Sequence, residues 1–115
     1  MTTTPRTPTE EIETREDNIS FIKWKIMILK KNIKQLKQKS EVEMTNINCS
    51  KAEIEFKTSK KLLKVWERHI KRRERRVGCL KLDISIYEGE IIRLKNEIKN
   101  HEKQIKSLKA KTLWI

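Results

Sequence analysis

The chain has 115 residues, of which 38% are charged and 36% hydrophobic, and it contains only two glycines and two prolines. A chain of this length forms one small domain or a set of helices, and so little glycine and proline excludes collagen-like, linker-like and loop-rich β classes. Its 28 lysines and arginines outnumber 16 aspartates and glutamates, giving a formal charge of +12. Such a charge favours a polyanionic partner, such as nucleic acid, an acidic membrane or an acidic protein surface.

The N-terminal residues 1–7 are rich in threonine, and we expect them to form a mobile tail. A helix start follows directly. Thr7 can cap the helix, Pro8 suits its first position, and Glu10 is placed to complete a capping box.

A heptad repeat of apolar residues continues from this start. Isoleucine occupies one position and isoleucine or leucine the position three residues later, and Arg15 alone departs from the pattern. The repeat weakens after Lys39, where turn-forming residues such as Asn46 precede a second capping box. We therefore predict a basic amphipathic helix over residues 8–44 and a break over residues 45–50. The apolar seam of this helix contains Ile12, Ile19, Ile22, Ile26, Leu29, Ile33 and Leu36.

A second heptad repeat begins at Cys49 and keeps one frame to the C-terminus. Its frame is offset from the first, and a single uninterrupted coiled coil would have to absorb that offset, so two helices are favoured. We predict the second helix over residues 51–112, either continuous or kinked at 78–79 beside a glycine, with His101 in its seam. The strongest part of its seam contains Val77, Leu80, Ile84, Tyr87, Ile91, Leu94, Ile98, Ile105 and Leu108.

Amphipathic helices of this length cannot bury their apolar seams alone. Burying each isoleucine or leucine contributes about 1.5–3 kcal/mol, whereas an exposed charge pair contributes about 0.5 kcal/mol. The seam therefore decides whether helices associate, and the charges bias the arrangement. A parallel dimer would oppose like charges, for example Arg76 and Lys81. We predict an all-α fold of long coiled-coil helices, as a helical hairpin or an oligomeric bundle, in which the seam residues named above mediate self-association or pairing with a foreign helix.

The first helix also carries a second apolar strip, formed by Phe21, Trp24 and Ile28. Two apolar faces favour contact with two neighbouring helices, as in a bundle. The alternative is a basic amphipathic helix that lies on an anionic membrane. The longest uninterrupted apolar run has four residues, so no transmembrane helix is predicted. Another flank of this helix gathers Lys23, Lys30, Lys34 and Lys37.

The sharpest local feature is the segment 68–76, which holds six basic residues in nine positions. Arginine offers a planar fork to phosphate oxygens, and arginine-rich helices enter nucleic-acid grooves. Arg73 falls at a seam position, which indicates a locally open coil or an acidic group opposite. A solvated surface paired with acids is the alternative interpretation. The candidate nucleic-acid-binding residues are Arg68, Lys71, Arg72, Arg73, Arg75 and Arg76, together with Lys23, Lys30, Lys34 and Lys37.

Sequence-specific DNA recognition is not supported by this pattern. DNA-binding zippers need an asparagine and an arginine at fixed distances before the zipper, and counting back from Leu80 finds Leu62 and Ile70 there. The pair Lys60 and Lys61, followed by the cluster ending at Arg76, does match a two-part nuclear address.

No nucleophile with a base, phosphate-cradling loop or paired catalytic carboxylates can be identified, and the two cysteines and two histidines lack metal-ligand spacing. We therefore expect no enzymatic activity, no metal, no cofactor and no small-molecule substrate. With no disulfide framework and no secretory signal, an intracellular location in the nucleus or cytoplasm is predicted.

The sequence thus favours an oligomeric coiled coil that presents basic helices to RNA or DNA with low sequence specificity, a composition that would suit a viral accessory protein. An adaptor or structural protein that recruits a protein partner is the first alternative, and a peripheral membrane protein that binds through its first helix is the second.

Overall fold

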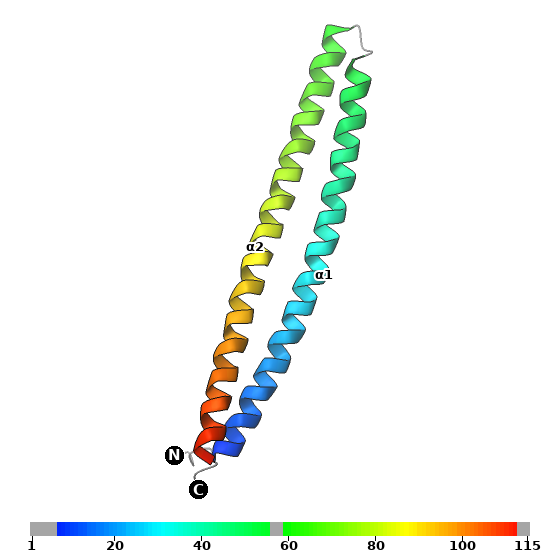
Figure 1. Cartoon of the computed structure of the whole chain (residues 1–115). Helices are drawn as coiled ribbons and strands as arrows, with labels where there is room; N and C mark the ends of the chain where they lie inside the picture. Colours follow the sequence, from blue (N-terminus) through cyan, green and yellow to red (C-terminus); the bar gives the residue numbers. More distant parts are fainter. Residues whose placement is uncertain (1–6, 56–58, 113–115) are drawn as a thin grey trace, which may run out of the picture. The chain divides into compact units, whose positions relative to one another are not determined.

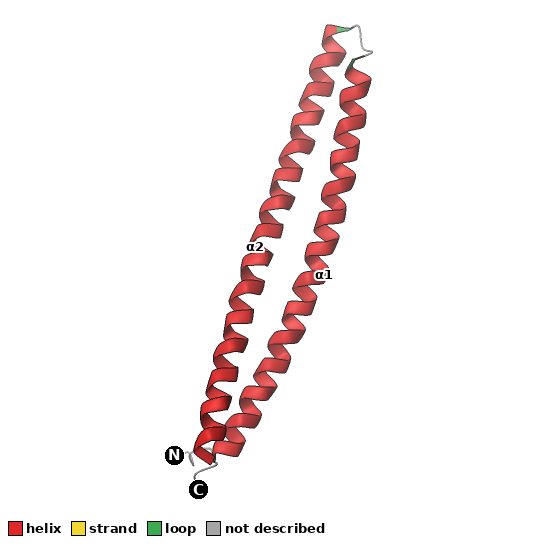
Figure 2. Ribbon diagram, viewed as in Figure 1, coloured by secondary structure: helices red, strands yellow, loops and turns green. Residues whose placement is uncertain are grey.

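The computed structural model describes residues 7–55 and 59–112, and within those ranges all regular structure is helical. Helix α1 spans Pro8–Ile54 and helix α2 spans Lys60–Thr112 (Figures 1 and 2). The prediction of an all-α fold made of long helices is confirmed. The tail predicted over residues 1–7 lies outside the described residues, apart from Thr7.

The start of α1 follows from its first residues. Thr7 Oγ1 accepts a hydrogen bond from the Glu10 backbone N–H at 3.2 Å, and the Thr7 carbonyl accepts one from the Glu11 N–H at 3.0 Å. These bonds satisfy backbone donors that the first turn leaves without helical partners. Glu10 and Glu11 also place negative charge at the positive end of the helix dipole. The predicted helix start is confirmed.

The predicted break over residues 45–50 is wrong, because these residues are helical and α1 continues to Ile54. The second helix starts at Lys60 rather than at residue 51. The sequence left open whether this helix is continuous or kinked at 78–79; both glycines lie within α2, and neither has a positive φ.

The physical reason for the missed helix lies in the seam of α1. The frame of the first repeat continues through Ser40, Ile47 and Ser50, all of which are buried, and Ile47 is only 1% exposed. Cys49 and Ala52, which the sequence placed in the second seam, are exposed. Two serines in seam positions hide the repeat without interrupting the helix, because a serine inside a helix lowers its propensity only slightly.

The chain divides into two compact units, and each combines a segment of α1 with a segment of α2. We call Lys30–Glu88 the turn unit, and Met1–Leu29 with Gly89–Ile115 the terminal unit. Within each unit the two helical segments run antiparallel, which makes the arrangement a helical hairpin (Figure 1).

The core of the turn unit is formed by Ile47, Ile70 and Val77, with Ile54 packed against them. Two ion pairs join the helices of this unit. Lys51 Nζ lies 3.2 Å from Glu74 Oε1, and Lys37 Nζ lies 3.7 Å from Glu88 Oε1. Their residue numbers rise on α1 as they fall on α2, so both pairs belong to one antiparallel register.

The terminal unit has an apolar core that includes the polar residues Arg15 and His101 at seam positions. Arg15 Nη1 lies 3.1 Å from His101 Nδ1, and Arg15 Nε lies 3.1 Å from Glu11 Oε1. The seam residues that we expected to mediate self-association are all buried or half-buried within a single chain. Buried residues of this unit are Ile19, Ile22, Ile26, Ile91, Leu94 and Ile105.

Candidate functional site

The positive charge of the chain is concentrated in the turn unit. Lys30–Glu88 contains 17 basic and 8 acidic residues, a net charge of +9, whereas the terminal unit contains 11 basic and 8 acidic residues, a net charge of +3. A polyanion is therefore attracted to the turn unit more strongly than to the terminal unit.

Three arginines of the segment 68–76 share the face of α2 that points away from the hairpin core. Arg68, Arg72 and Arg75 are spaced by four and three residues and are exposed, while Ile70 and Val77 on the opposite face are buried. Residues with this spacing are neighbours on a helix surface. We call these three residues the arginine row, and at 1.5 Å per residue it extends over about 10 Å of the helix.

The arginine row carries uncompensated charge. No ion pair joins its members to an acid in the part of the chain that the structure describes. Glu74, the acid within the same segment, is paired with Lys51 instead. The guanidinium donors of the row are therefore available to an external acceptor.

A small hollow of about 190 Å³ lies along this face, lined by Val65, Arg68, His69 and Arg72. The ring of His69 meets that of Trp66 edge-to-face, with 6.4 Å between the ring centroids. Two guanidinium groups and an imidazole thus line one concave surface, a donor set that suits phosphate oxygens. Sequence analysis did not assign His69 to the site, although its place one residue after Arg68 indicates this neighbourhood.

The other candidate residues lie in different surroundings. Arg73 is half-buried at its seam position, and Lys71 and Arg76 are exposed on either side of the arginine row. Lys37 is paired with Glu88, which lies about 20 Å along α2 from Arg75. Lys30 and Lys34 are exposed on α1 in the turn unit, and Lys23 is exposed in the terminal unit. The structure therefore groups the arginines of α2 and places Lys37 away from them.

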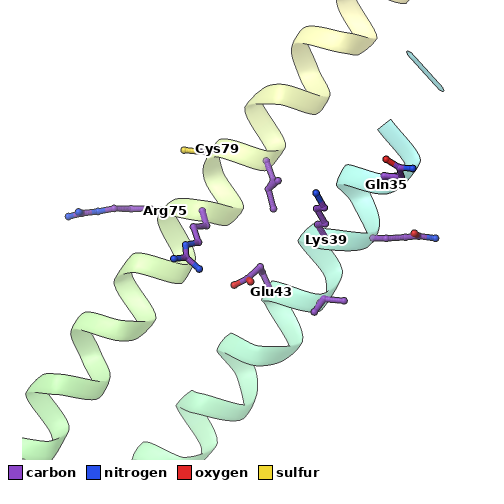
Figure 3. Close-up of a pocket in the computed structure, with 9 residues that line it drawn as sticks. Gln35, Lys39, Glu43, Arg75 and Cys79 are labelled. Carbon is purple, nitrogen blue, oxygen red and sulfur yellow. The ribbon is translucent and has the colours of Figure 1, made fainter. Parts of the chain in front are cut away.

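A larger groove of about 690 Å³ opens between α1 and α2 in the turn unit (Figure 3). Arg75 and Cys79 project from α2 on the side away from α1, and Glu43 extends from α1 toward α2 (Figure 3). Glu43 Oε2 is buried and, within the described ranges, has no hydrogen-bond partner. Sequence analysis missed this groove because it exists only once the register of the two helices is known. Its lining residues are Gln35, Gln38, Lys39, Val42, Glu43, Arg75, Arg76, Cys79 and Leu80.

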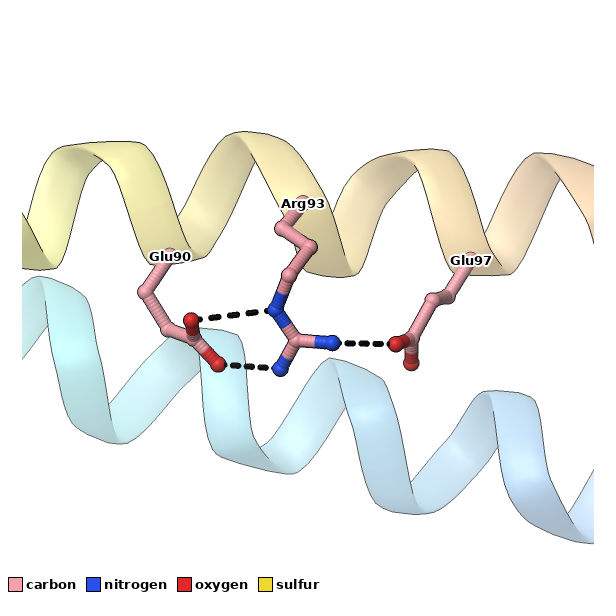
Figure 4. A network of polar contacts seen from close by, with 3 residues as sticks. All are labelled: Glu90, Arg93 and Glu97. Atoms are coloured by element: carbon pink, nitrogen blue, oxygen red, sulfur yellow. Dashed lines mark hydrogen bonds and ion pairs between the residues drawn. The ribbon is translucent and has the colours of Figure 1, made fainter.

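In the terminal unit, by contrast, Arg93 is paired with acidic residues. Arg93 donates hydrogen bonds to the carboxylates of Glu90 and Glu97 on its own helix (Figure 4). The Arg93 hydrogen bond, together with the charges of Arg93 and Lys25, holds the pKa of the Glu90 carboxyl below its usual value despite some desolvation. Hydrogen bonding to Glu90 raises the pKa of Arg93. Arg93 is thus neutralised locally, unlike the arginine row.

Neither a metal-binding cluster nor a membrane-spanning helix is found in the described ranges. No three histidine, cysteine, aspartate or glutamate residues lie close enough there to hold a metal ion. Neither helix, as far as it is described, has a stretch that combines the length and the apolar character needed to cross a membrane.

Comparisons with known proteins assign no family to this arrangement. No protein-family model matches the chain, and neither curated proteins nor solved structures gave a significant match.

Proposed function

We propose that the chain is a non-enzymatic coiled-coil protein that binds nucleic acid, RNA or DNA, with low sequence specificity. The observation that carries this proposal is the arginine row, three exposed guanidinium groups that no described acid pairs with, on one face of the unit that holds a net charge of +9. His69 and Lys71 beside the row would add further donors to phosphate oxygens.

The spacing of the row suits a phosphate backbone. One strand of a duplex carries a phosphate every 3.4 Å of helix axis, so a row of about 10 Å faces about three phosphates. Contacts to phosphates position a protein on nucleic acid but carry no sequence information directly. The proposed contacts are made to phosphates, so we expect the chain to distinguish little between nucleic-acid sequences.

The decisive experiment removes the charge of the row and compares it with a matched loss elsewhere on α2. The variant Arg68→Gln/Arg72→Gln/Arg75→Gln loses three charges from the row, and Lys103→Gln/Lys106→Gln/Lys109→Gln loses three from the terminal unit. Fluorescence anisotropy with a labelled RNA and a labelled DNA, at 50–200 mM salt, measures affinity and its salt dependence.

For the row variant we expect affinity to fall about 10-fold or more for every sequence tested, and the slope of log affinity against log salt to shrink by about 2–3. For the terminal-unit variant we expect a smaller loss and a nearly unchanged slope. If both variants lose the same affinity and show the same salt dependence, the arginine row is not the binding site.

A location in the nucleus or cytoplasm belongs to the same proposal. Lys60 and Lys61 are exposed at the start of α2 and precede the arginine cluster with the spacing of a two-part nuclear address. A fluorescent fusion that loses nuclear accumulation on Lys60→Gln/Lys61→Gln would support a nuclear location.

Binding to a membrane surface is a second candidate, favoured by one observation in the terminal unit. Phe21 and Trp24 are 54% and 52% exposed and stack with 5.8 Å between ring centroids, and Lys25 Nζ lies 4.7 Å from the Phe21 ring centroid. Exposed aromatic rings beside lysines are typical of helices that lie at an anionic lipid surface. Flotation with vesicles containing phosphatidylserine, lost on Phe21→Ser/Trp24→Ser, would support this candidate.

A further inference from the structure

The groove of the turn unit is lined by both apolar and cationic side chains. Among its lining residues Val42 is 58% exposed, Leu80 is half-buried and Cys79 is exposed. The cationic lining residues include Lys39 from α1 and Arg76 from α2. Apolar side chains exposed between two packed helices offer a surface on which a third helix can lay its own apolar side chains.

The charges of the groove decide which kind of helix fits. Lys39, Arg75 and Arg76 contribute three positive charges, against the single carboxylate of Glu43. An occupant with acidic residues flanking its apolar stripe would pair with these cations. The buried Glu43 Oε2, which no donor in the described residues reaches, could accept a hydrogen bond from a hydroxyl or amide of the occupant.

We propose that this groove binds an acidic amphipathic helix of a partner protein. The apolar stripe of that helix covers Val42 and Leu80, and its acidic flanks meet Lys39 and Arg76. The proposed interface lies beside the arginine row and shares only Arg75 with it, so the chain would bind a protein and a nucleic acid through two neighbouring surfaces of the turn unit.

A second copy of the chain fits this groove less well. In a symmetric dimer the same patch meets itself, so the three cations would face three cations. Like charges at such short range are destabilising. Nucleic acid also fits less well, because phosphates do not cover an exposed valine and the Glu43 carboxylate repels them.

The two native cysteines provide a local readout of occupancy. Cys79 lines the groove, whereas Cys49 belongs to the same unit but lies outside the lining, and both thiols are exposed and free. The probe is a synthetic 21-residue helical peptide with leucine at heptad positions a and d and glutamate at e and g. Its glutamates oppose pairing with itself. A matched peptide carries lysine in place of every glutamate.

Maleimide labelling of the full chain, followed by mass spectrometry, is compared with and without each peptide. We expect the acidic peptide to slow labelling of Cys79 by about 5-fold or more while labelling of Cys49 is unchanged, and the lysine peptide to protect neither. Equal protection of both cysteines, or equal effects of the two peptides, would overturn the proposal. Protection of Cys79 that rises with protein concentration in the absence of peptide would assign the groove to a second copy.

Two variants test whether the acidic peptide needs the apolar surface of the groove or only its positive charge. Val42→Lys removes apolar surface and adds positive charge, so we expect it to weaken the acidic peptide about 10-fold by anisotropy while RNA binding is kept. Lys39→Glu/Arg76→Glu should abolish binding of the acidic peptide, whereas Lys60→Glu/Lys61→Glu, with the same change of charge outside the groove, should weaken it much less.

Circular dichroism checks that each variant keeps its helical content. Unchanged peptide binding in a folded Val42→Lys variant would overturn the proposal. This test is independent of the proposed nucleic-acid site, because Lys39, Val42 and Arg76 do not belong to the arginine row. If the arginine row does not bind nucleic acid, the peptide result is unaffected.

Discussion

Arg15 and His101 are polar residues at seam positions of the terminal unit, and the structure brings them into contact. The arginine can only donate, so His101 Nδ1 accepts. The Glu11 carboxylate forms an ion pair with Arg15 at 3.1 Å from Nε, although Nε makes no hydrogen bond within the described residues. A polar residue in a coiled-coil seam costs stability but favours the register in which it finds a partner. The pair therefore helps to select one alignment of α1 and α2 within this unit.

This pairing predicts that the two residues are coupled in stability. In Arg15→Leu, His101 loses its partner, and in His101→Leu, Arg15 loses one of its two partners, while the double variant completes an apolar seam. We expect the double variant to be more stable than either single variant, with a coupling of about 1 kcal/mol. Urea unfolding followed by circular dichroism measures all four proteins. A double variant less stable than both single variants would contradict the pairing.

Glu90 offers a second test at the scale of single residues. Its pKa is lowered chiefly by the Arg93 hydrogen bond, so the carboxylate stays ionised to lower pH than an ordinary glutamate. The stabilising contribution of this ion pair is present above the unfolded-state pKa and is lost as the pH falls through the lower folded-state pKa. In Arg93→Gln we expect the Glu90 pKa to rise toward its usual value.

Carbon-detected NMR titration of the Glu90 side chain measures this shift directly. Lys25→Gln should raise the Glu90 pKa by less, because the charge of Lys25 is a smaller cause than the Arg93 contacts. A Glu90 pKa that does not respond to Arg93→Gln would show that the hydrogen bonds do not form in solution.

At the scale of the helices, the sequence predicts most of what positions the site. The spacing of Arg68, Arg72 and Arg75 already places them on one face, and the heptad frame of α2 identifies its buried side. The end of α1 is missed because Ser40 and Ser50 occupy seam positions, so the apolar repeat fades while the helix continues. Extending the first frame by whole heptads reaches Ile47, which would have revealed the continuation.

The groove could not be predicted in the same way. Its residues come from two helices, and their proximity depends on the alignment that Lys51–Glu74 and Lys37–Glu88 mark. Local sequence patterns specify which face of each helix is buried. They do not specify how far one helix is shifted along the other, because that alignment depends on the sum of many weak pair interactions.

The continuity of α2 predicts the effect of replacing its glycines. Gly78 and Gly89 are both exposed inside the helix, neither has a positive φ, and a Cβ built at either position meets no atom within 4 Å. Alanine has a higher helix propensity and loses less backbone entropy on folding. We expect Gly78→Ala and Gly89→Ala each to raise the free energy of unfolding by about 0.5–1 kcal/mol.

Urea unfolding measures these two variants, and their effects should add, because the two glycines lie eleven positions apart along α2. Destabilisation by Gly78→Ala would indicate that the helix is interrupted there, since an alanine opposes a left-handed or tightly packed turn but favours a continuous helix.

For the whole molecule, the main consequence of the hairpin is that one chain fills its own apolar seam. The side chains that we expected to join copies of the protein are used within each unit, so the surfaces left for partners are the outer faces of the helices and the groove between them. In our proposals, the net charge of +9 on the turn unit attracts acidic partners to its arginine row and to the groove. Self-association stays a prediction, and it would have to use these outer faces.

The two native cysteines test the hairpin and self-association together. If residues 49–79 formed one continuous helix, Cys49 and Cys79 would lie about 45 Å apart. In the hairpin, the Lys51–Glu74 pair holds nearby residues of α1 and α2 side by side, so we expect spin labels on the two cysteines to lie under about 30 Å apart by pulsed electron paramagnetic resonance. A distance distribution centred near 45 Å would contradict the antiparallel arrangement.

The single-cysteine variant Cys49→Ser is the control, because any distance measured between its labels must join two chains. Since the seam is filled and like charges repel at the groove, we expect no distance below about 60 Å in this variant at micromolar concentration and 150 mM salt, where the Debye length is about 8 Å. A short distance in Cys49→Ser would place Cys79 of one copy near Cys79 of another. It would identify the face of α2 around Cys79 as an interface between copies. That result would contradict the proposal that the groove binds an acidic helix of a partner protein.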